Sequence, residues 1–180
     1  MPQESCSPLL CPKLYLRSVF DLPLDQLKER GIRGLIFDLD NTLLYWNAYE
    51  VTPEAKELFR RLKQTGFVSC LVSNNKRDRV EKVARVLDVP AISKARKPSR
   101  RAFRQALATL GTTEKETAVV GDQLFTDVLG GNRLGLYTVL VMPLSKREFF
   151  GTKAIRSLER IVLRRLIRRG LVEKPATEGQ

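Results

Sequence analysis

The chain has 180 residues, of which 43% are hydrophobic and 29% are charged, a composition typical of one globular domain with a substantial core. Its formal charge of +12 indicates an anionic partner, such as a nucleic acid, a membrane surface or a phosphorylated substrate. The sequence contains no histidine, which excludes histidine nucleophiles, general bases and metal ligands. Any chemistry must therefore use carboxylates, Lys, Ser, Thr, Cys or a metal ion.

The cysteines and the N-terminal residues bear on where the protein works. Cys6, Cys11 and Cys70 are too few and too unevenly placed for a disulfide framework, which favours a reducing, cytoplasmic compartment. Residues 1–11 have no basic lead or sustained apolar run, so we expect no signal peptide. No stretch approaches the ~20 apolar residues of a membrane span. We expect a cytoplasmic protein, attached at most peripherally to the inner face of the membrane.

Segments typical of strands and helices alternate along the chain. After a short helix that ends at Gly31, the apolar run from Gly34 predicts a buried strand that stops at Asp38 and Asp40. Further strands are predicted at 67–72, 90–92, 117–122 and 137–141, and helices at 52–66, 76–87, 99–110 and 124–134. Gly130 and Gly131 weaken the last of these helices. This alternation predicts an α/β fold built on a three-layer, doubly wound parallel sheet.

We expect a single domain whose parts follow in order. Residues 1–33 form an N-terminal lead-in that packs on the core, 34–150 form the core, 151–170 a basic amphipathic helix and 171–180 a tail. Within the core, the polar and aromatic segment 41–51, with Tyr45, Trp46 and Tyr49, predicts a loop or flap over the end of the first strand.

Polar residues follow the predicted strands where each strand ends. The carboxyl ends of parallel strands meet at one edge of a sheet, and ligands bind in the crevice outside that edge. Asp127, five residues past Asp122, can fold back toward the same point. The residues expected to converge there are Asp38, Asp40, Ser73, Lys97, Asp122 and Asp127.

Each of these residues also has a purely structural interpretation. The pair Asp38 and Asp40 can cap a turn, Ser73 with the two following asparagines can form a turn, and Lys97-Pro98 can begin a helix in solvent. Their occurrence in strand order favours a shared site instead. Two like charges at Asp38 and Asp40 are costly without a positive charge between them, which a divalent cation would supply.

These segments resemble the four motifs of the haloacid dehalogenase (HAD) superfamily of phosphatases. The similar residues are Asp38 to Thr42, Ser73, Lys97-Pro98 and Gly121 to Asp127. More closely, residues 72–75, 95–98 and 121–135 resemble the YqeG family of capless, subclass IIIA HAD phosphatases, and the similarity runs from about Leu9 to Gly170. That family is related to phosphatases that convert phosphatidylglycerophosphate to phosphatidylglycerol.

The resemblance implies catalytic roles for the aspartates at the first strand and for the lysine. Asp38 would be the nucleophile that forms an aspartyl-phosphate. Asp40 would protonate the leaving alkoxide and then activate the hydrolytic water. Lys97 would neutralise the charge of the transferring phosphoryl group.

The resemblance also implies binding roles. Ser73 and Asn74 would bind the phosphoryl group, and Thr42 would orient the loop that bears Asp40. A Mg²⁺ ion would be held by Asp38, Asp122 and the backbone carbonyl of Asp40, with Asp127 assisting directly or through water. These are the ligand and substrate contacts expected at the sheet edge.

The spacing between the motifs limits what can cover the site. Twelve residues separate Asp40 from Pro53 and twenty-three separate Ser73 from Lys97, which leaves no room for a separate cap domain. We therefore expect an open site. An open site suits a head group or side chain presented on something large better than it suits a small metabolite.

Basic residues gather near the predicted site and in the C-terminal helix. Six lie between Lys94 and Arg104, and seven lie between Gly151 and Gly170 with Glu159 as the lone acid of that stretch. Apolar residues recur among the latter at helical spacing (Ile155, Leu158, Val162, Leu166 and Ile167), which is typical of a helix in a membrane interface. The same pattern also fits a helix that packs on the sheet with solvated charges outside.

The resemblance implies a Mg²⁺-dependent phosphomonoesterase, with phosphatidylglycerophosphate as the first candidate substrate, and the expected open site and basic residues are consistent with it. Another phosphomonoester, carried by a protein, a sugar or a nucleotide, stays open because the motifs recognise phosphate and not the leaving group. A basic protein bound to RNA or the ribosome is the non-enzymatic alternative, but no nucleic-acid-binding motif with stacking aromatic residues is present.

Overall fold

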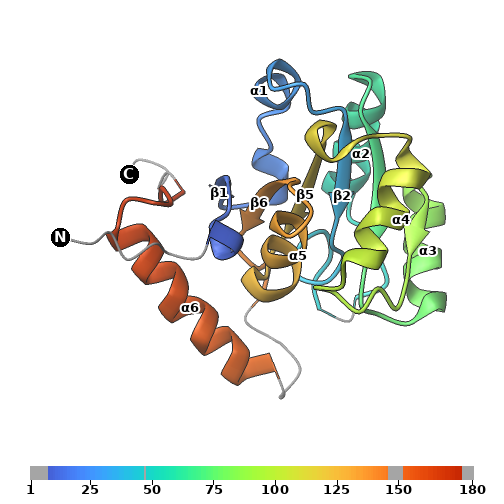
Figure 1. Ribbon diagram of the computed structural model, residues 1–180. Helices are drawn as coiled ribbons and strands as arrows, with labels where there is room; N and C mark the ends of the chain where they lie inside the picture. The colour runs from blue at the N-terminus through green and yellow to red at the C-terminus, as the bar shows by residue number, and fades with distance from the viewer. Residues whose placement is uncertain (1–7, 47, 146–151, 176–180) are drawn as a thin grey trace.

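The computed structural model describes residues 8–46, 48–145 and 152–175, and it contains a six-stranded sheet in which every pairing is parallel. The strand order is β1-β6-β5-β2-β3-β4, with helices on both faces (Figure 1). The strands are β1 (Leu14–Leu16), β2 (Gly34–Phe37), β3 (Val68–Val72), β4 (Ala91–Ile92), β5 (Thr117–Gly121) and β6 (Tyr137–Val141). The predicted doubly wound α/β fold is confirmed.

The central strand β2 is buried along its whole length because both of its faces are covered. It pairs with β3 on one side and β5 on the other, with Phe37 opposite Leu71 and Val120. This register brings the carboxyl ends of β2, β3 and β5 to the same edge. The residues that follow these strands therefore start from neighbouring positions.

The helices divide between the two faces of the sheet. Helices α1 (Leu24–Glu29), α2 (Pro53–Gln64) and α3 (Arg77–Leu87) pack on the face that carries Phe37 and Leu71. Helix α4 (Arg100–Leu110) packs on the opposite face, against Ile36 and Val119. Helices α5 (Leu129–Asn132) and α6 (Thr152–Arg168) lie on this second face, where Leu140 contacts α6. Short helical turns are η1 (Pro8–Leu10), η2 (Val19–Asp21), η3 (Glu114–Glu116) and the π-helical η4 (Leu124–Val128).

Helices α2 and α4 begin where the sequence predicts. Thr52 caps α2 by accepting a hydrogen bond from the Ala55 amide at 3.2 Å, and Pro53 occupies the first helical position. Ser99 caps α4, which ends at Gly111 with φ of 63°, a left-handed conformation that glycine adopts without strain.

Two segments differ from the prediction. Part of the N-terminal lead-in is strand β1, which extends the sheet beside β6, with Leu14 opposite Val139. The predicted helix over 124–134 begins as the single π turn η4, since the amides of Asp127 and Val128 both donate to the carbonyl oxygen of Gln123.

The two glycines after this turn have a packing role. A Cβ on Gly130 would lie 2.4 Å from the Phe103 ring, and one on Gly131 would lie 2.4 Å from Val119 Cγ1. Glycine at both positions lets α5 approach α4 and the sheet closely, which offsets the low helical propensity of glycine.

The apolar residues of helix α6 differ in burial along its length. Near its end, Leu166 is buried, and Val162 and Leu163 pack against Leu124, Val128 and Leu140. Near its start, Ile155 and Leu158 are exposed. The single apolar stripe predicted for 151–170 thus covers the sheet only in part. Val172, in the predicted tail, is also buried. Among the described residues, no helix has the length and apolar character needed to cross a membrane.

Candidate active site

The site begins where β2 ends. The Asp38 amide still donates to the Val120 carbonyl at 2.9 Å, so Asp38 stays in register with β5. The chain then turns, with Asn41 at φ of 58° and its amide donating to the Leu44 carbonyl at 2.7 Å. Asp38 is buried, whereas Asp40, which directly precedes the turn, is partly exposed.

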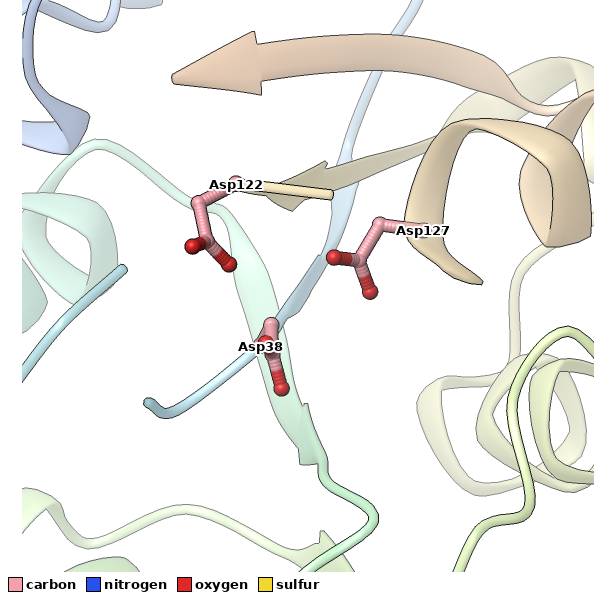
Figure 2. A group of neighbouring side chains, drawn as sticks. All are labelled: Asp38, Asp122 and Asp127. Atoms are coloured by element: carbon pink, nitrogen blue, oxygen red, sulfur yellow. The ribbon is translucent and has the colours of Figure 1, made fainter. Parts of the chain in front are cut away.

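Three carboxylates meet at this edge of the sheet. Asp38 follows β2, Asp122 follows β5 and Asp127 lies in η4, and each offers an oxygen within 4.8 Å of the others (Figure 2). Gly121 makes room for this arrangement, because a Cβ there would lie 2.3 Å from the Asp127 carboxylate. The structure therefore brings together the side chains of three of the four acids expected at this edge; the fourth, Asp40, lies apart from the cluster.

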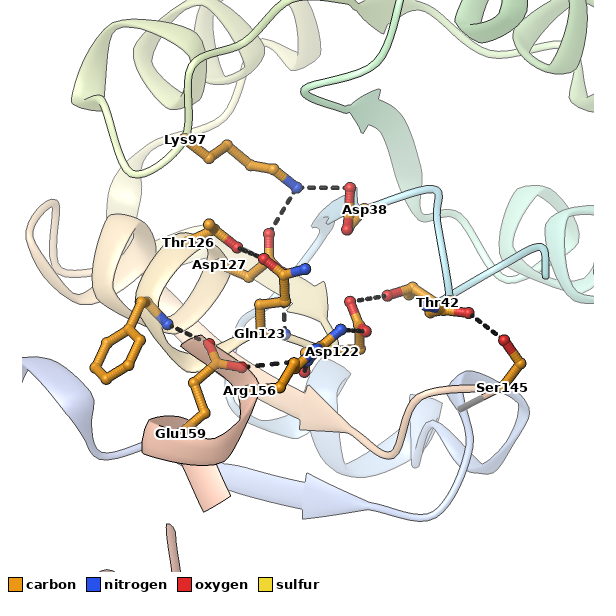
Figure 3. Close-up of polar contacts among 12 residues, drawn as sticks. Asp38, Thr42, Lys97, Asp122, Gln123, Thr126, Asp127, Ser145, Arg156 and Glu159 are labelled. Carbon is orange, nitrogen blue, oxygen red and sulfur yellow. Dashed lines mark hydrogen bonds and ion pairs between the residues drawn. The ribbon is translucent and has the colours of Figure 1, made fainter. Parts of the chain in front are cut away.

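Lys97 lies between two of these acids. Its Nζ is 2.6 Å from Asp38 Oδ1 and 2.7 Å from Asp127 Oδ1 (Figure 3). The backbone amide of Lys97 donates to Asn74 Oδ1 at 2.8 Å, which ties the loop after β4 to the end of β3. The ammonium group is buried, so it is held at a fixed place beside the nucleophile candidate.

Burial and charge shift the pKa of Asp38, Asp122 and Lys97. Burial raises the pKa of Asp38 to about 6, with Lys97 opposing and Asp127 adding to the rise. Burial also raises the pKa of Asp122 to about 8, against the influence of a neighbouring arginine, Arg156. For Lys97, burial lowers the pKa, but the nearby Asp127 and Asp38 outweigh it and the net pKa is raised. The lysine stays charged, whereas the acids hold protons more readily than solvated carboxyls do.

Asp40 lies at the rim of the cluster. Its Oδ1 is 2.6 Å from Arg79 Nη1, and its Oδ2 accepts from Asn75 Nδ2 at 2.9 Å. Arg79 comes from α3 and also donates through Nε and Nη2 to the carbonyl of Ala48, at 3.1 and 2.8 Å. This one buried guanidinium thus joins Asp40 to the loop that follows it.

The remaining predicted residues lie around the same edge. Thr42 is buried, and its hydroxyl donates to Asp122 Oδ1 at 3.4 Å. Ser73 is buried at the end of β3, where its Oγ accepts from the Asn75 amide at 3.2 Å. The Asn74 side chain contacts the Lys97 amide, a contact that shapes the lysine loop.

The sequence of this chain is similar over most of its length to known phosphatases. It is 40% identical over 162 residues to "Probable phosphatase YqeG" of Bacillus subtilis, covering 90% of this chain and 94% of that protein. The chain belongs to the YqeG family of HAD-like phosphatases. A HAD-hydrolase-like family model matches residues 94–143, which include Lys97, Asp122 and Asp127.

Other relatives of this HAD phosphatase extend the comparison. Phosphatidylglycerophosphate phosphatase 1 of Arabidopsis thaliana is 30% identical over 171 residues, covering 89% of this chain, which spans about half (49%) of the plant protein. The cobalt-bound deoxy-D-mannose-octulosonate 8-phosphate phosphatase of Haemophilus influenzae has the same fold, with a TM-score of 0.52 at 14% identity over 76% of this chain and 90% of that one.

The three carboxylates fit the divalent metal that HAD phosphatases generally use. Carboxylate oxygens are the preferred ligands of Mg²⁺, and three buried acids this close together are costly without a cation. The Asp40 side chain instead faces Arg79 and Asn75, so the side-chain donors brought together among the described residues are those of Asp38, Asp122 and Asp127, while the backbone carbonyl of Asp40 stays a predicted ligand.

Sequence reasoning missed two residues of this HAD phosphatase site that approach from α6. The guanidinium of Arg156 pairs with Asp122 Oδ2, donates to the Asp122 carbonyl at 2.7 Å and lies 3.3 Å from Glu159 Oε2 (Figure 3). Glu159 Oε1 accepts from the Phe125 amide at 2.9 Å, so the pair anchors α6 to η4. The sequence did contain one signal for this pair. Arg156 and Glu159 are three residues apart among the apolar residues of the predicted helix, a spacing that makes two side chains neighbours on a helix surface.

Proposed function

We propose that this phosphatase hydrolyses phosphomonoesters through an aspartyl-phosphate on Asp38, with Mg²⁺ held by Asp38, Asp122 and Asp127. The observation that carries the proposal is the position of Lys97, whose Nζ lies 2.6 Å from Asp38 within the acidic cluster. When bound, the metal would supply Lewis-acid polarisation and charge neutralisation at the phosphoryl oxygens. The lysine supplies a further fixed positive charge for the same group.

In the first half of the reaction, an Asp38 oxygen attacks phosphorus as the bond to the alcohol oxygen breaks. Asp40 gives its proton to the departing alkoxide. In the second half, the Asp40 carboxylate takes a proton from water, the water oxygen attacks phosphorus, and Asp38 leaves with the electron pair of its bond to phosphorus. The products are the free alcohol and inorganic phosphate.

The neighbours of these residues suit their roles. Asn75 and Arg79 hold the Asp40 carboxylate at the rim, on the side from which a leaving group can depart toward solvent. Ser73 and Asn74 lie at the end of β3, and we assign their side-chain donors to the phosphoryl oxygens, since the Ser73 amide already donates to the Ile92 carbonyl. Thr42 contacts Asp122 and orients the turn that carries Asp40.

The substrate we propose is phosphatidylglycerophosphate, which would be converted to phosphatidylglycerol. The plant relative that shares 30% identity carries the name of this activity. Between Ser73 and Lys97 the chain has only helix α3 and strand β4, which leaves the site open to a head group at a membrane surface. We place the protein in the cytoplasm, peripherally at the inner face of the membrane, where this lipid would be reached.

Phosphate release from phosphatidylglycerophosphate in mixed micelles tests this proposal. We expect turnover that requires Mg²⁺ and exceeds the turnover of soluble sugar, nucleotide and peptide phosphomonoesters under the same conditions. A preference for the soluble esters would overturn the lipid assignment and leave the phosphatase assignment intact. Salt-sensitive binding to RNA without phosphatase activity would favour the non-enzymatic alternative.

A further inference from the structure

Large apolar side chains are exposed around the candidate site. Tyr45 and Trp46 follow the turn after β2, and Trp46 is the single tryptophan of the chain. Met142 follows β6, the strand that enters the sheet beside β5. All of these segments leave the sheet at its carboxyl edge, the edge that carries Asp38 and Asp122. The exposed apolar residues on this edge are Tyr45, Trp46, Tyr49, Met142, Ile155 and Leu158.

These residues approach the site from both faces of the sheet. On one face, the ring of Tyr49 lies 5.6 Å from the charged groups of Arg79 and Lys82 in α3. On the other face, Ile155 and Leu158 flank Arg156, whose guanidinium contacts Asp122. The loop after β2 and the start of α6 both lie toward the lower side of the molecule in Figure 1. Exposed apolar residues therefore occur in two segments, the loop after β2 and the start of α6, that lie next to the arginines paired with Asp40 and Asp122.

Exposed basic residues complete this border. Helices α3 and α4 begin at the same edge because each follows a strand that ends there, and their first turns carry Arg77, Arg100 and Arg101. Lys94 and Arg96 precede α4, and both are exposed. Exposed acids also occur at this edge, at Glu50, Glu54 and Asp78, but the exposed basic residues Arg77, Lys94, Arg96, Arg100 and Arg101 outnumber them.

We propose that this edge, defined by the apolar residues named above and by the basic segment 94–101, is a docking surface for an anionic lipid bilayer. Aromatic side chains such as Trp and Tyr favour the membrane–water interface, and basic residues are attracted to anionic lipid. Docking through this edge places the opening of the site against the bilayer. A lipid phosphate then reaches Asp38 while its acyl chains stay in the membrane, an arrangement that rests on the proposed lipid substrate.

A nucleic acid is the other polyanion that a basic surface could bind. Exposed aliphatic side chains at Met142, Ile155 and Leu158 have no stacking role with bases, whereas they gain from burial in the acyl boundary. The mixture of aliphatic, aromatic and basic side chains on one edge favours the bilayer.

The fluorescence of Trp46 tests the proposal directly, because no other tryptophan contributes to the signal. We expect a blue shift of its emission with phosphatidylcholine vesicles that contain phosphatidylglycerol, and quenching when brominated acyl chains replace the ordinary ones. Emission that is unchanged by these vesicles would overturn the proposal. A shift produced by RNA and not by vesicles would also overturn it.

Matched variants locate the surface. The double variant Ile155→Ser with Leu158→Ser should weaken vesicle binding by at least about tenfold, since each change removes apolar area from the membrane. Val86→Ser is the control, because Val86 is equally exposed but lies at the end of α3, away from this edge. If Val86→Ser weakened vesicle binding as much as the double variant does, the proposed location of the surface would be contradicted.

Charge variants supply a second, independent measure. Arg100→Gln and Arg101→Gln should each weaken binding about fivefold, and the loss should shrink at high salt. Lys28→Gln and Lys115→Gln, exposed at the opposite edge, should leave binding unchanged. Two activity assays separate the docking proposal from the substrate proposal. If the protein hydrolyses a soluble phosphomonoester but does not bind vesicles, the docking surface alone is wrong. If it binds vesicles but does not hydrolyse phosphatidylglycerophosphate, the proposed substrate alone is wrong.

Discussion

Arg79 and Arg156 reach the site from opposite faces of the sheet, and each pairs with a carboxylate that follows a strand. Arg79, in α3, pairs with Asp40, whose side chain is 21% exposed. Arg156, in α6, pairs with Asp122, whose side chain is 0% exposed. The first acid lies where a proton can be exchanged with an alcohol or water. The second lies in the cluster that would hold the metal.

The same kind of ion pair therefore has different consequences in the two places. At Asp40, the guanidinium fixes the position of a group that, in the proposed mechanism, must reach the leaving oxygen, so its loss should slow turnover. At Asp122, it adds a positive charge next to a site for a divalent cation, so it should weaken metal binding. Variants at the two arginines should separate a catalytic effect from a metal-affinity effect.

The largest effect is expected for Arg79→Met. We predict a fall in kcat of about 100-fold with little change in KM for a soluble phosphomonoester, because Asp40 and the loop at Ala48 both lose their anchor. Steady-state kinetics with the soluble phosphomonoester measure both kcat and KM. Arg79→Lys should recover part of the loss, since the ammonium keeps the charge but not all three contacts.

Arg77→Met is the matched control for that variant. Arg77 is an exposed neighbour on α3 that pairs with Glu81, and its loss should leave kcat unchanged. A fall in kcat as large as that of the Arg79 variant would indicate a general effect on α3 and would contradict the positioning role.

A smaller effect, and of a different kind, is expected for Arg156→Gln. We predict that Mg²⁺ binds about tenfold more tightly, because a positive charge beside the metal ligands is removed. Calorimetric titration of both proteins over a pH series that extends well above 8 measures the affinity with Asp122 ionised, since its pKa is about 8 and the loss of Arg156, which lowers that pKa, raises it further in the variant. In the unchanged protein, affinity should rise with pH up to about 8, because protonated carboxyls must lose their protons to bind metal. Weaker Mg²⁺ binding by the variant would show that Arg156 chiefly orients Asp122.

Arg160→Gln serves as the control on α6. Arg160 lies one turn further along the helix and contacts Ser157, so its substitution should not change metal affinity. A change in Mg²⁺ affinity as large as that of Arg156→Gln would indicate a general effect of helix α6 and would contradict the specific role of Arg156.

The smallest effect is expected for Tyr49→Leu. This substitution removes the aromatic ring 5.6 Å from the Arg79 guanidinium, an interaction worth about 0.5–1 kcal/mol at an exposed site. Turnover should fall less than about threefold and Mg²⁺ affinity should not change. A loss as large as that of Arg79→Met would mean that the aromatic loop, and not the ion pair, positions Asp40.

Much of the fold and the acidic cluster could be predicted because both depend on local patterns. A parallel sheet brings the residues after its strands to one edge, so Asp38, Asp122 and Lys97 could be expected together from strand order alone. Strand β1 was missed because it has three residues and its partner β6 lies more than a hundred residues later. A strand that short has too little periodicity to be recognised.

The two arginines could not be predicted from the same patterns. Arg79 lies in the first turn of α3 like any charged helical residue, and only the tertiary contact with Asp40 distinguishes it. The apolar residues of α6 formed one predicted stripe, but the helix buries Leu166 near its end and leaves Ile155 exposed near its start, next to Arg156, which faces the site. Side-chain partners across the fold are set by packing, which helical periodicity does not specify.

The central claim is that Asp38 carries the phosphoryl group during turnover. Mass spectrometry of protein quenched in acid during hydrolysis of phosphatidylglycerophosphate, followed by peptide mapping, tests it most directly. We predict a phosphoryl adduct on Asp38 and, for Asp38→Asn, neither adduct nor turnover. An adduct on another residue, or near-normal turnover by Asp38→Asn, would contradict the account.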